Sequence, residues 1–276
     1  MKKPEYLRWI IEEKAYISNC DCDVKCFEIS YNNNPAILDD WALHIRRHYI
    51  SDEELDDECI NLETSAKDYL TENIIPSRTE QREKVARSFV ITEILISDLL
   101  EFLEGYSVPR VRYYNLSSKS ATVLGTDVIG YKYAAPDKTP SVNDELVLAE
   151  VKGKLASTDT SVINQAIEHS KLDEFRVSVS INHVRRKMNV LGYKKEAKEL
   201  LRFQKKTSTD YRTEYIAAGI TSLDSMSRMV INGKEVLVVP DVDGKDFVVG
   251  NNREIFFIHG RELMNLTHEI FDRCIK

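Results

Sequence analysis

The sequence predicts an α/β (α+β) fold in which helices flank a central mixed sheet, with an α-rich extension at the N-terminus. Two observations lead to this prediction. A long apolar helical pattern at 77–104 is followed by runs typical of strands, and helical and strand-like segments then succeed one another to the C-terminus. Segments in this order commonly form layers around one core. The 276 residues suffice for one large domain or a main domain with an appendage.

The extension is predicted to cover residues 1–76. An alternating run at 24–31 indicates a strand, and it ends in a cluster of turn-forming residues at 32–35. Residues 36–75 then resemble two or three short helices. Nine acidic residues and only two arginines lie within 39–63. We therefore expect an acidic lobe ahead of the main domain.

The main domain, residues 77–276, is predicted to begin with its longest helix. Residues 77–80 match the capping-box pattern, and Gly105 would end the helix. Apolar residues on more than one side indicate a helix buried in the core. Glu93 shares a face with these apolar residues, where a carboxylate costs free energy unless a cation meets it. It either faces a metal site or forms a hydrogen bond at a helix–sheet contact.

The rest of the main domain alternates strands and helices. Strands are expected at 108–114, 121–133, 144–152, 215–221, 235–240 and 255–258. Two or three helices are expected within 160–203, and a last helix at 261–274. Pro136, Pro140 and Asn143 mark a turn that would pair the second and third strands as a hairpin.

The composition is that of an ordinary globular protein, with 42% hydrophobic and 30% charged residues. No segment approaches the roughly 18 apolar residues of a membrane helix, and the N-terminus lacks the apolar run of a signal peptide. We therefore expect a cytoplasmic protein that does not enter a membrane. The net charge of -7 means that any binding of nucleic acid must depend on a local basic surface.

Five cysteines fit a reducing compartment, because their odd number argues against a disulfide scaffold. Cys20, Cys22 and Cys26 are close enough to suggest part of a zinc site with His44 or His48. The paired C-x-x-C spacing of structural zinc sites is missing, however. We interpret these cysteines as reduced thiols.

The residues most suggestive of chemistry end a buried strand. Glu150 and Lys152 follow an apolar run and point to the same face, because side chains alternate along a strand. Alone they could be an ordinary ion pair. The predicted hairpin would bring Asp127 beside Glu150. Two carboxylates and the main-chain carbonyl of Val151 form the partial oxygen shell that Mg²⁺ or Mn²⁺ prefers, and Lys152 could orient the attacking water.

Two further groups of residues suggest contact with a substrate. Gln165 lies early in the helix after this strand and could reach a phosphate or the water network; otherwise it is a plain surface residue. Nine basic residues lie within 185–206, and the bland alternative for them is a solvated helix face. The predicted DNA-binding residues are Arg185, Arg186, Lys187, Lys194 and Lys195.

In this order, Glu93, Asp127, Glu150-x-Lys152 and Gln165 resemble the PD-(D/E)xK nuclease superfamily, although Thr126 stands at the position of the motif's leading proline. Residues 20–276 further resemble the HamA family, the nuclease subunits of the Hachiman anti-phage system. This likeness is carried by residues 125–130, 149–152, 170–173 and 256–263.

The resemblance implies a restriction-endonuclease-like core that degrades DNA with little sequence preference. It also implies a superfamily 2 helicase partner, HamB, which holds the nuclease inactive until infection or DNA damage releases it. The acidic extension would dock on that partner, and the helicase would supply most phosphate contacts. This would account for an acidic protein that acts on DNA.

Other functional classes stay open from the residues alone. A non-catalytic DNA-binding or regulatory subunit has no reason to keep three carboxylates and a lysine. A glycoside hydrolase would use two carboxylates as acid and base, but it would act without metal and give Lys152 no role. His259 is interpreted as structural, because no nucleophile or third partner is visible in the sequence.

Overall fold

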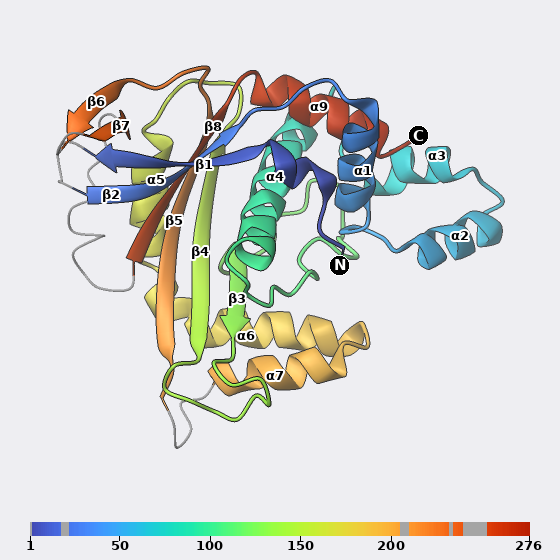
Figure 1. Ribbon diagram of the computed structural model, residues 1–276. Helices are drawn as coiled ribbons and strands as arrows, with labels where there is room; N and C mark the ends of the chain where they lie inside the picture. The colour runs from blue at the N-terminus through green and yellow to red at the C-terminus, as the bar shows by residue number, and fades with distance from the viewer. Residues whose placement is uncertain (1, 18–21, 205–209, 232–233, 240–252) are drawn as a thin grey trace.

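The computed structural model describes residues 2–17, 22–204, 210–231, 234–239 and 253–276. These residues form an eight-stranded mixed sheet in the order β3-β4-β5-β8-β2-β1-β7-β6 (Figure 1). The strands are β1 (Ile10–Ile17), β2 (Cys22–Ile29), β3 (Val128–Lys132), β4 (Glu145–Lys154), β5 (Arg212–Ser222), β6 (Arg228–Ile231), β7 (Lys234–Val238) and β8 (Arg253–Gly260). The predicted α/β fold with a central mixed sheet is confirmed.

Four adjacent strands, β4, β5, β8 and β2, run parallel, while β3–β4, β1–β2 and β6–β7 are antiparallel pairs. Strand β4 lies inside the sheet, and residues 146–149 are completely buried. A parallel strand covered on both faces reads as a continuous apolar run, which is why the sequence located β4 so well.

Helices cover both faces of the sheet (Figure 1). They are η1 (Glu5–Trp9), α1 (Pro35–Arg46), α2 (Asp52–Asn61), α3 (Ala66–Tyr69), η2 (Leu70–Ile74), α4 (Gln81–Phe102), α5 (Val162–Ser170), α6 (Asp173–Val190), α7 (Lys194–Gln204) and α9 (Leu263–Arg273). Helix α4 packs on β3, β4 and α9, whereas α5 packs on β4 and β5. No helix among these is long and apolar enough to cross a bilayer.

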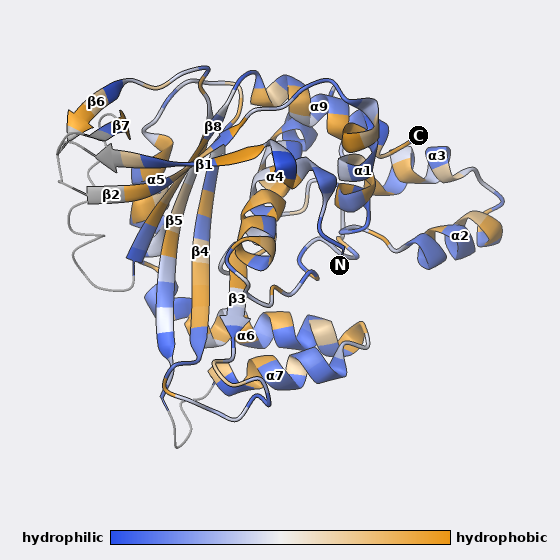
Figure 2. Ribbon diagram, in the orientation of Figure 1, coloured by the Kyte–Doolittle hydropathy of each residue, from blue (hydrophilic) through white to orange (hydrophobic). Residues whose placement is uncertain are grey.

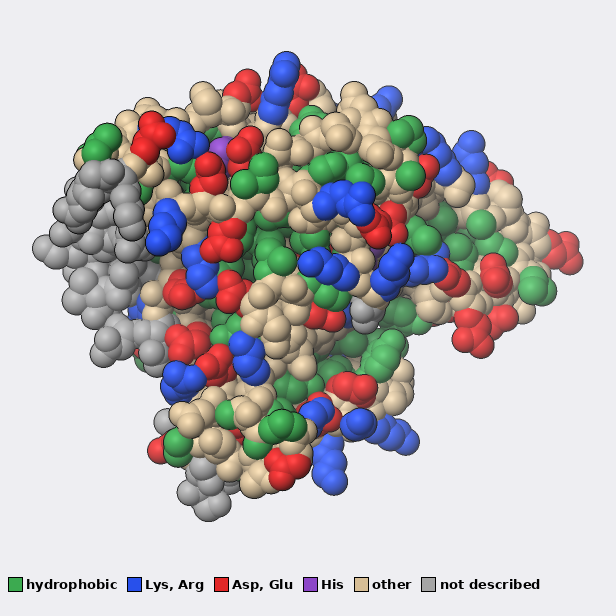
Figure 3. Space-filling model, viewed as in Figure 1, with side chains coloured by type: hydrophobic (Ala, Val, Ile, Leu, Met, Phe, Trp, Pro, Cys, Tyr) green, Lys and Arg blue, Asp and Glu red, His purple; other side chains and the backbone are tan. Residues whose placement is uncertain are grey.

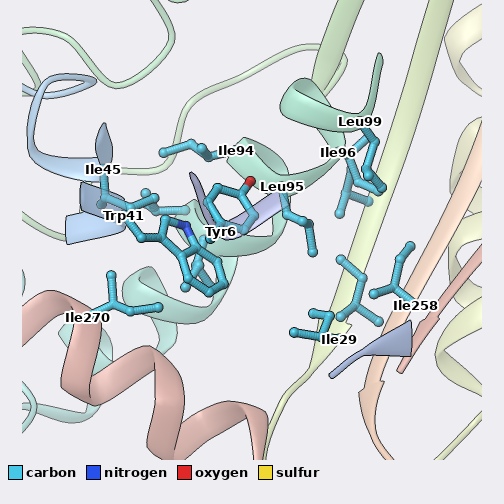
Figure 4. Close-up of a cluster of buried hydrophobic side chains, with 14 of the residues drawn as sticks. Tyr6, Ile29, Trp41, Ile45, Ile94, Leu95, Ile96, Leu99, Ile258 and Ile270 are labelled. Atoms are coloured by element: carbon cyan, nitrogen blue, oxygen red, sulfur yellow. The ribbon is translucent and has the colours of Figure 1, made fainter. Parts of the chain in front are cut away.

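Helix α4 carries the larger core. Its residues Ile94, Leu95, Ile96 and Leu99 are buried among side chains from η1, α1, α9 and the sheet (Figure 4). Figure 2 shows the same distribution, with hydrophobic residues concentrated on α4 and the central strands. The predicted helix buried in the core is therefore confirmed, but it begins at Gln81 after the N-cap Glu80 and not at the capping-box residues.

The clearest error concerns residues 108–114, which were expected to form a strand. They lie in turns and extended chain, and only Ser107 forms an isolated bridge, with Tyr131. The predicted strand at 121–133 is likewise reduced to β3. Tertiary contacts explain the difference, because Arg110 and Arg112 pair with buried acids on α4. Strands β1 and β6 were not anticipated.

Residues of the predicted extension share the sheet and core with the rest of the chain. Strand β2 pairs with β8, and α1 packs on α9. Of the helices in this extension, α2 and α3 project from the body of the molecule (Figure 1). A role for residues 1–76 in docking a partner stays a prediction.

A buried ionic network attaches the N-terminal region to α4. Asp98 is fully buried. It accepts hydrogen bonds from the Tyr6 hydroxyl at 2.6 Å and from His44 Nε2 at 2.9 Å, and its other oxygen lies 2.7 Å from the Arg110 guanidinium. Burial lowers the pKa of the neighbouring His48 to about 3, so this imidazole is neutral. One carboxylate thus joins η1, α1, α4 and the segment after α4.

Asp98→Ala is expected to lower the free energy of unfolding by roughly 3 kcal/mol, because it removes the acceptor shared by Tyr6 and His44 and leaves Glu101 as the counter-ion of Arg110. Urea denaturation followed by circular dichroism measures the change. Asp57→Ala, on the exposed surface of α2, is the control and should stay within about 0.5 kcal/mol of the parent protein. Equal effects of the two substitutions would contradict a stabilising network.

Candidate active site

The β3–β4 hairpin brings two carboxylates together. Val128 pairs with Ala149 in the antiparallel register, so Asp127, just before β3, lies next to Glu150. The two side chains are only 14% and 10% exposed. The backbone N–H of Val151 donates to Asp127 Oδ2 at 3.0 Å. The hairpin contact expected from the sequence is therefore present.

Lys152 is one of the cations that contact these two carboxylates. Its ammonium group contacts the Glu150 carboxylate, lies 3.9 Å from Asp127 Oδ2 and is 3.4 Å from the Val151 carbonyl oxygen. All three groups predicted to bind a metal therefore surround the Lys152 amine. Burial and the nearby Glu150 charge raise the pKa of Asp127.

Arg112 is a second cation at the site, and sequence reasoning did not identify it. Its guanidinium bridges two carboxylates, 2.5 Å from Glu93 and 2.9 Å from Asp127. It also donates to the main-chain carbonyl of Thr126 at 2.9 Å. The signal available in the sequence was a pair of arginines, Arg110 and Arg112, in an otherwise strand-like run without nearby acids. Such residues need partners from elsewhere in the fold.

Glu93 reaches the site through Arg112. Its carboxylate accepts a hydrogen bond from the Tyr113 hydroxyl and is 8% exposed. Burial, with a smaller contribution from Asp127, raises the pKa of Glu93 to about 8. The Arg112 ion pair opposes this rise, but the loss of solvation on burial outweighs it.

A fourth buried carboxylate, Asp173 on α6, was also missed as a site residue. It accepts a hydrogen bond from the Thr126 hydroxyl at 2.8 Å, and burial raises its pKa to about 7. The Glu150 and Asp127 charges act in the same direction. Its only sequence signal was its place in the 170–173 segment.

Gln165 lies on the exposed surface of α5. In the structure, the α5 residue that contacts the carboxylates is His169, one turn later, with Nδ1 3.4 Å from Glu150. Among the described residues, no hydrogen bond joins Gln165 to Asp127, Glu150 or Lys152. A contact of Gln165 with substrate stays a prediction.

The five predicted DNA-binding residues lie on α6 and α7 and have different environments. Arg186, Lys194 and Lys195 are exposed. Arg185 donates to the Ala197 carbonyl and to Gln204. Lys187 is half-buried and donates to the Arg112 carbonyl at 3.0 Å. Of the five, three are therefore free to face a solvent-borne ligand.

An open groove of about 690 Å³ leads to the hairpin. The first half of α4 and the segment 112–123 form its walls, and Phe89 and Lys119 are among the residues that line it. Asp127, Val151 and Lys152 lie where the groove meets the sheet. The site is thus accessible from outside along this groove.

The donor set at the hairpin fits a hard divalent cation in kind. Mg²⁺ is commonly held by one or two carboxylates, with water and substrate supplying the remaining oxygens, and Asp127, Glu150 and the Val151 carbonyl offer this set. Among the described residues, no group of three or more His, Cys, Asp or Glu side chains converges on one cation position. Arg112 and Lys152 now neutralise the carboxylates, so a metal would compete with them.

The remaining candidates lie elsewhere. Cys26 is a buried free thiol. Cys20 and the Cys22 side chain fall outside the described residues, so the zinc alternative stays a hypothesis. His259 is buried and approaches the Leu223 carbonyl at 3.2 Å, which agrees with a structural role.

Glu93→Gln is expected to change how stability depends on pH in metal-free buffer. Between pH 4.5 and about 8 the folded chain keeps a proton on Glu93 that the unfolded chain releases. The unfolding free energy of the parent protein therefore falls as pH rises through this window. The variant lacks this loss of stability. The unfolding free energy of the parent protein minus that of the variant should therefore decrease by about 1 kcal/mol or more between pH 5 and 9. A constant difference in urea titrations would contradict the raised pKa.

A protein-family model described as HamA matches residues 4–274 of the chain. The match extends from η1 to the end of α9 and so includes the β3–β4 hairpin, the segment with Arg112 and helix α6. No curated protein matches the chain.

Proposed function

The chain belongs to the HamA family, which associates it with Hachiman antiviral defence, and on this premise we propose that it is a metal-dependent deoxyribonuclease. The observation that carries the proposal is the Asp127–Glu150–Lys152 cluster. Two buried carboxylates and a lysine meet at the end of the hairpin, and Asp127 and Lys152 line an open groove. Such a cluster has no evident use in stabilising the fold, because buried charges are costly to keep.

In the proposed mechanism, Asp127, Glu150 and the Val151 carbonyl hold Mg²⁺ or Mn²⁺. When bound, the metal lowers the pKa of a coordinated water and offsets charge on the scissile phosphate. Lys152 orients the attacking water from its position between the two carboxylates. Glu93 keeps Arg112 at the edge of the site. Arg112, which lies 2.9 Å from Asp127, would be close enough to the site to donate to a phosphate oxygen.

DNA is the proposed substrate, held mainly through its backbone. The exposed residues Arg186, Lys194 and Lys195 provide phosphate contacts that carry no sequence information. Basic side chains gather over the α6–α7 hairpin in Figure 3. Little sequence preference follows, because these contacts are to phosphates and not to base edges.

A superfamily 2 helicase is the proposed partner that restrains the nuclease. Helix α2 projects from the body and carries exposed acidic residues together with Ile60 and Leu62, which are 74% and 58% exposed (Figures 1 and 3). An apolar surface surrounded by acids suits a protein with a basic surface more than it suits DNA. A partner bound at α2 would not itself cover the Asp127–Glu150–Lys152 cluster, so DNA could reach the cluster when the partner stops restraining the nuclease.

Lys152→Ala is expected to reduce Mg²⁺-dependent cleavage of plasmid DNA by about 100-fold or more, because the water loses the group that orients it. Glu150→Ala should abolish cleavage by removing a metal ligand. Gel analysis of plasmid DNA with Mg²⁺, and then with EDTA, measures both effects.

The matched control is Lys132→Ala, at the far end of β3, where the amine donates to the Glu104 carbonyl. It should cleave at the parent rate. Undiminished cleavage by Lys152→Ala would refute the assignment of this lysine. A parent protein that binds plasmid DNA but never cleaves it with Mg²⁺ would instead favour a non-catalytic regulatory subunit.

The double variant Lys194→Ala/Lys195→Ala is expected to weaken DNA binding equally for unrelated sequences. The slope of log affinity against log salt concentration should fall by roughly 2, as expected for two lost phosphate contacts. Fluorescence anisotropy with two oligonucleotides at several salt concentrations measures both effects. Lys67→Ala, on the exposed surface of α3, is the control, and an unchanged slope in the double variant would exclude these lysines from the interface.

A further inference from the structure

One face of helix α6 contacts the two backbone segments that carry Asp127 and Arg112. Asp173, Ser180 and Lys187 are spaced by seven residues, or nearly two helical turns, and so lie on the same face. Asp173 and Ser180 both contact Thr126, and Lys187 donates to the Arg112 carbonyl. The face therefore holds the two backbone stretches that deliver Asp127 and Arg112.

The contacts at Thr126 are buried and closely packed. Thr126, Asp173 and Ser180 are 4%, 1% and 3% exposed. The Thr126 hydroxyl lies 2.8 Å from Asp173 Oδ1 and 3.2 Å from Ser180 Oγ, and the Thr126 backbone N–H donates to the same Ser180 oxygen at 3.3 Å. Gly125 has a φ of +97°, and a Cβ there would lie 3.3 Å from Ser180 Oγ. The chain turns against α6 just before Asp127.

Burying the Asp173 carboxyl group costs more folding free energy than stabilising a turn requires. Within the described residues its second oxygen, Oδ2, is buried without a hydrogen-bond partner, and a buried carboxyl group that is only half satisfied costs folding free energy. A site role accounts better for a carboxylate at this position.

We propose that Asp173 and Ser180 are positioning residues that fix Thr126 and thereby hold the Asp127 carboxylate beside Glu150 for metal binding. The inference rests on the proposed function. Asp127 itself accepts from the Val151 N–H and from Arg112, but both contacts act on its side chain. The α6 contacts act on the backbone that carries it. Outer partners of this kind typically change metal affinity or activity by 10–100-fold when they are removed.

The test measures Mn²⁺ binding to the full-length chain by isothermal titration calorimetry, together with plasmid cleavage over a range of Mn²⁺ concentrations. Thr126→Val and Asp173→Ala each remove the hydrogen bond between the two side chains. Each should raise the Mn²⁺ dissociation constant by about tenfold or more and lower cleavage accordingly. Thr126→Ser keeps the hydroxyl and should bind and cleave like the parent protein. The double variant Thr126→Val/Asp173→Ala should be no worse than the poorer single variant, because both remove the same contact.

Ser178→Ala is the matched control, since Ser178 is exposed on α6 and should have no effect. Thermal unfolding followed by circular dichroism identifies any variant that does not fold. Ser180→Ala, the smallest change, then carries the test if Asp173→Ala fails to fold, and it should also raise the dissociation constant.

Parent-like Mn²⁺ affinity in Thr126→Val and Asp173→Ala would overturn the inference while leaving the nuclease proposal intact. Loss of Mn²⁺ binding in Asp173→Ala but not in Thr126→Val would overturn it as well, because Asp173 would then act directly on the metal. A parent chain that neither binds Mn²⁺ nor cleaves DNA would overturn the proposed function and this inference together.

Discussion

The structure around the site depends on one electrostatic constraint: carboxylates buried at the end of the β3–β4 hairpin must be neutralised. Strand pairing places Asp127 beside Glu150, and two like charges in a low-dielectric region repel strongly. Among the described residues, the permanently charged cations that contact these two carboxylates are Lys152 and Arg112. His169 also approaches Glu150. A divalent cation held by the same carboxylates would take over the charge compensation that Lys152 and Arg112 provide.

This constraint explains why the chain after α4 forms no regular strand. Arg110 and Arg112 extend toward Asp98 and Glu93, two acids on α4 that are five residues apart. Ladder pairing would have to compete with these buried ion pairs, whose loss leaves an uncompensated charge. The segment instead lies along α4 and is held from the other side by Lys187 on α6. Its irregular backbone is thus determined by side-chain partners.

The same pairs connect distant parts of the molecule. Asp98 joins the N-terminal region, through Tyr6 and His44, to Arg110, and Arg112 follows two residues later at the site. The projecting α2 follows directly from α1, which carries His44. A partner docked at α2 would therefore act on α1, whose His44 is connected through Asp98 and Arg110 to the segment that carries Arg112. This continuity gives a physical route by which restraint at the N-terminal region could reach the carboxylates.

Local patterns in the sequence determined the α/β class, the buried helix α4, the buried strand β4 and the hairpin that unites Asp127 with Glu150 and Lys152. Each follows from hydrophobic periodicity and turn residues within a short window. The tertiary structure alone decided that Arg112 bridges Glu93 and Asp127. It also decided that Asp173 and Ser180 form hydrogen bonds with Thr126. On α5 it placed His169, and not Gln165, in contact with Glu150. These contacts join residues from separate elements, and no local pattern encodes them, because long-range ion pairs are selected by burial and by the charges that the fold brings together.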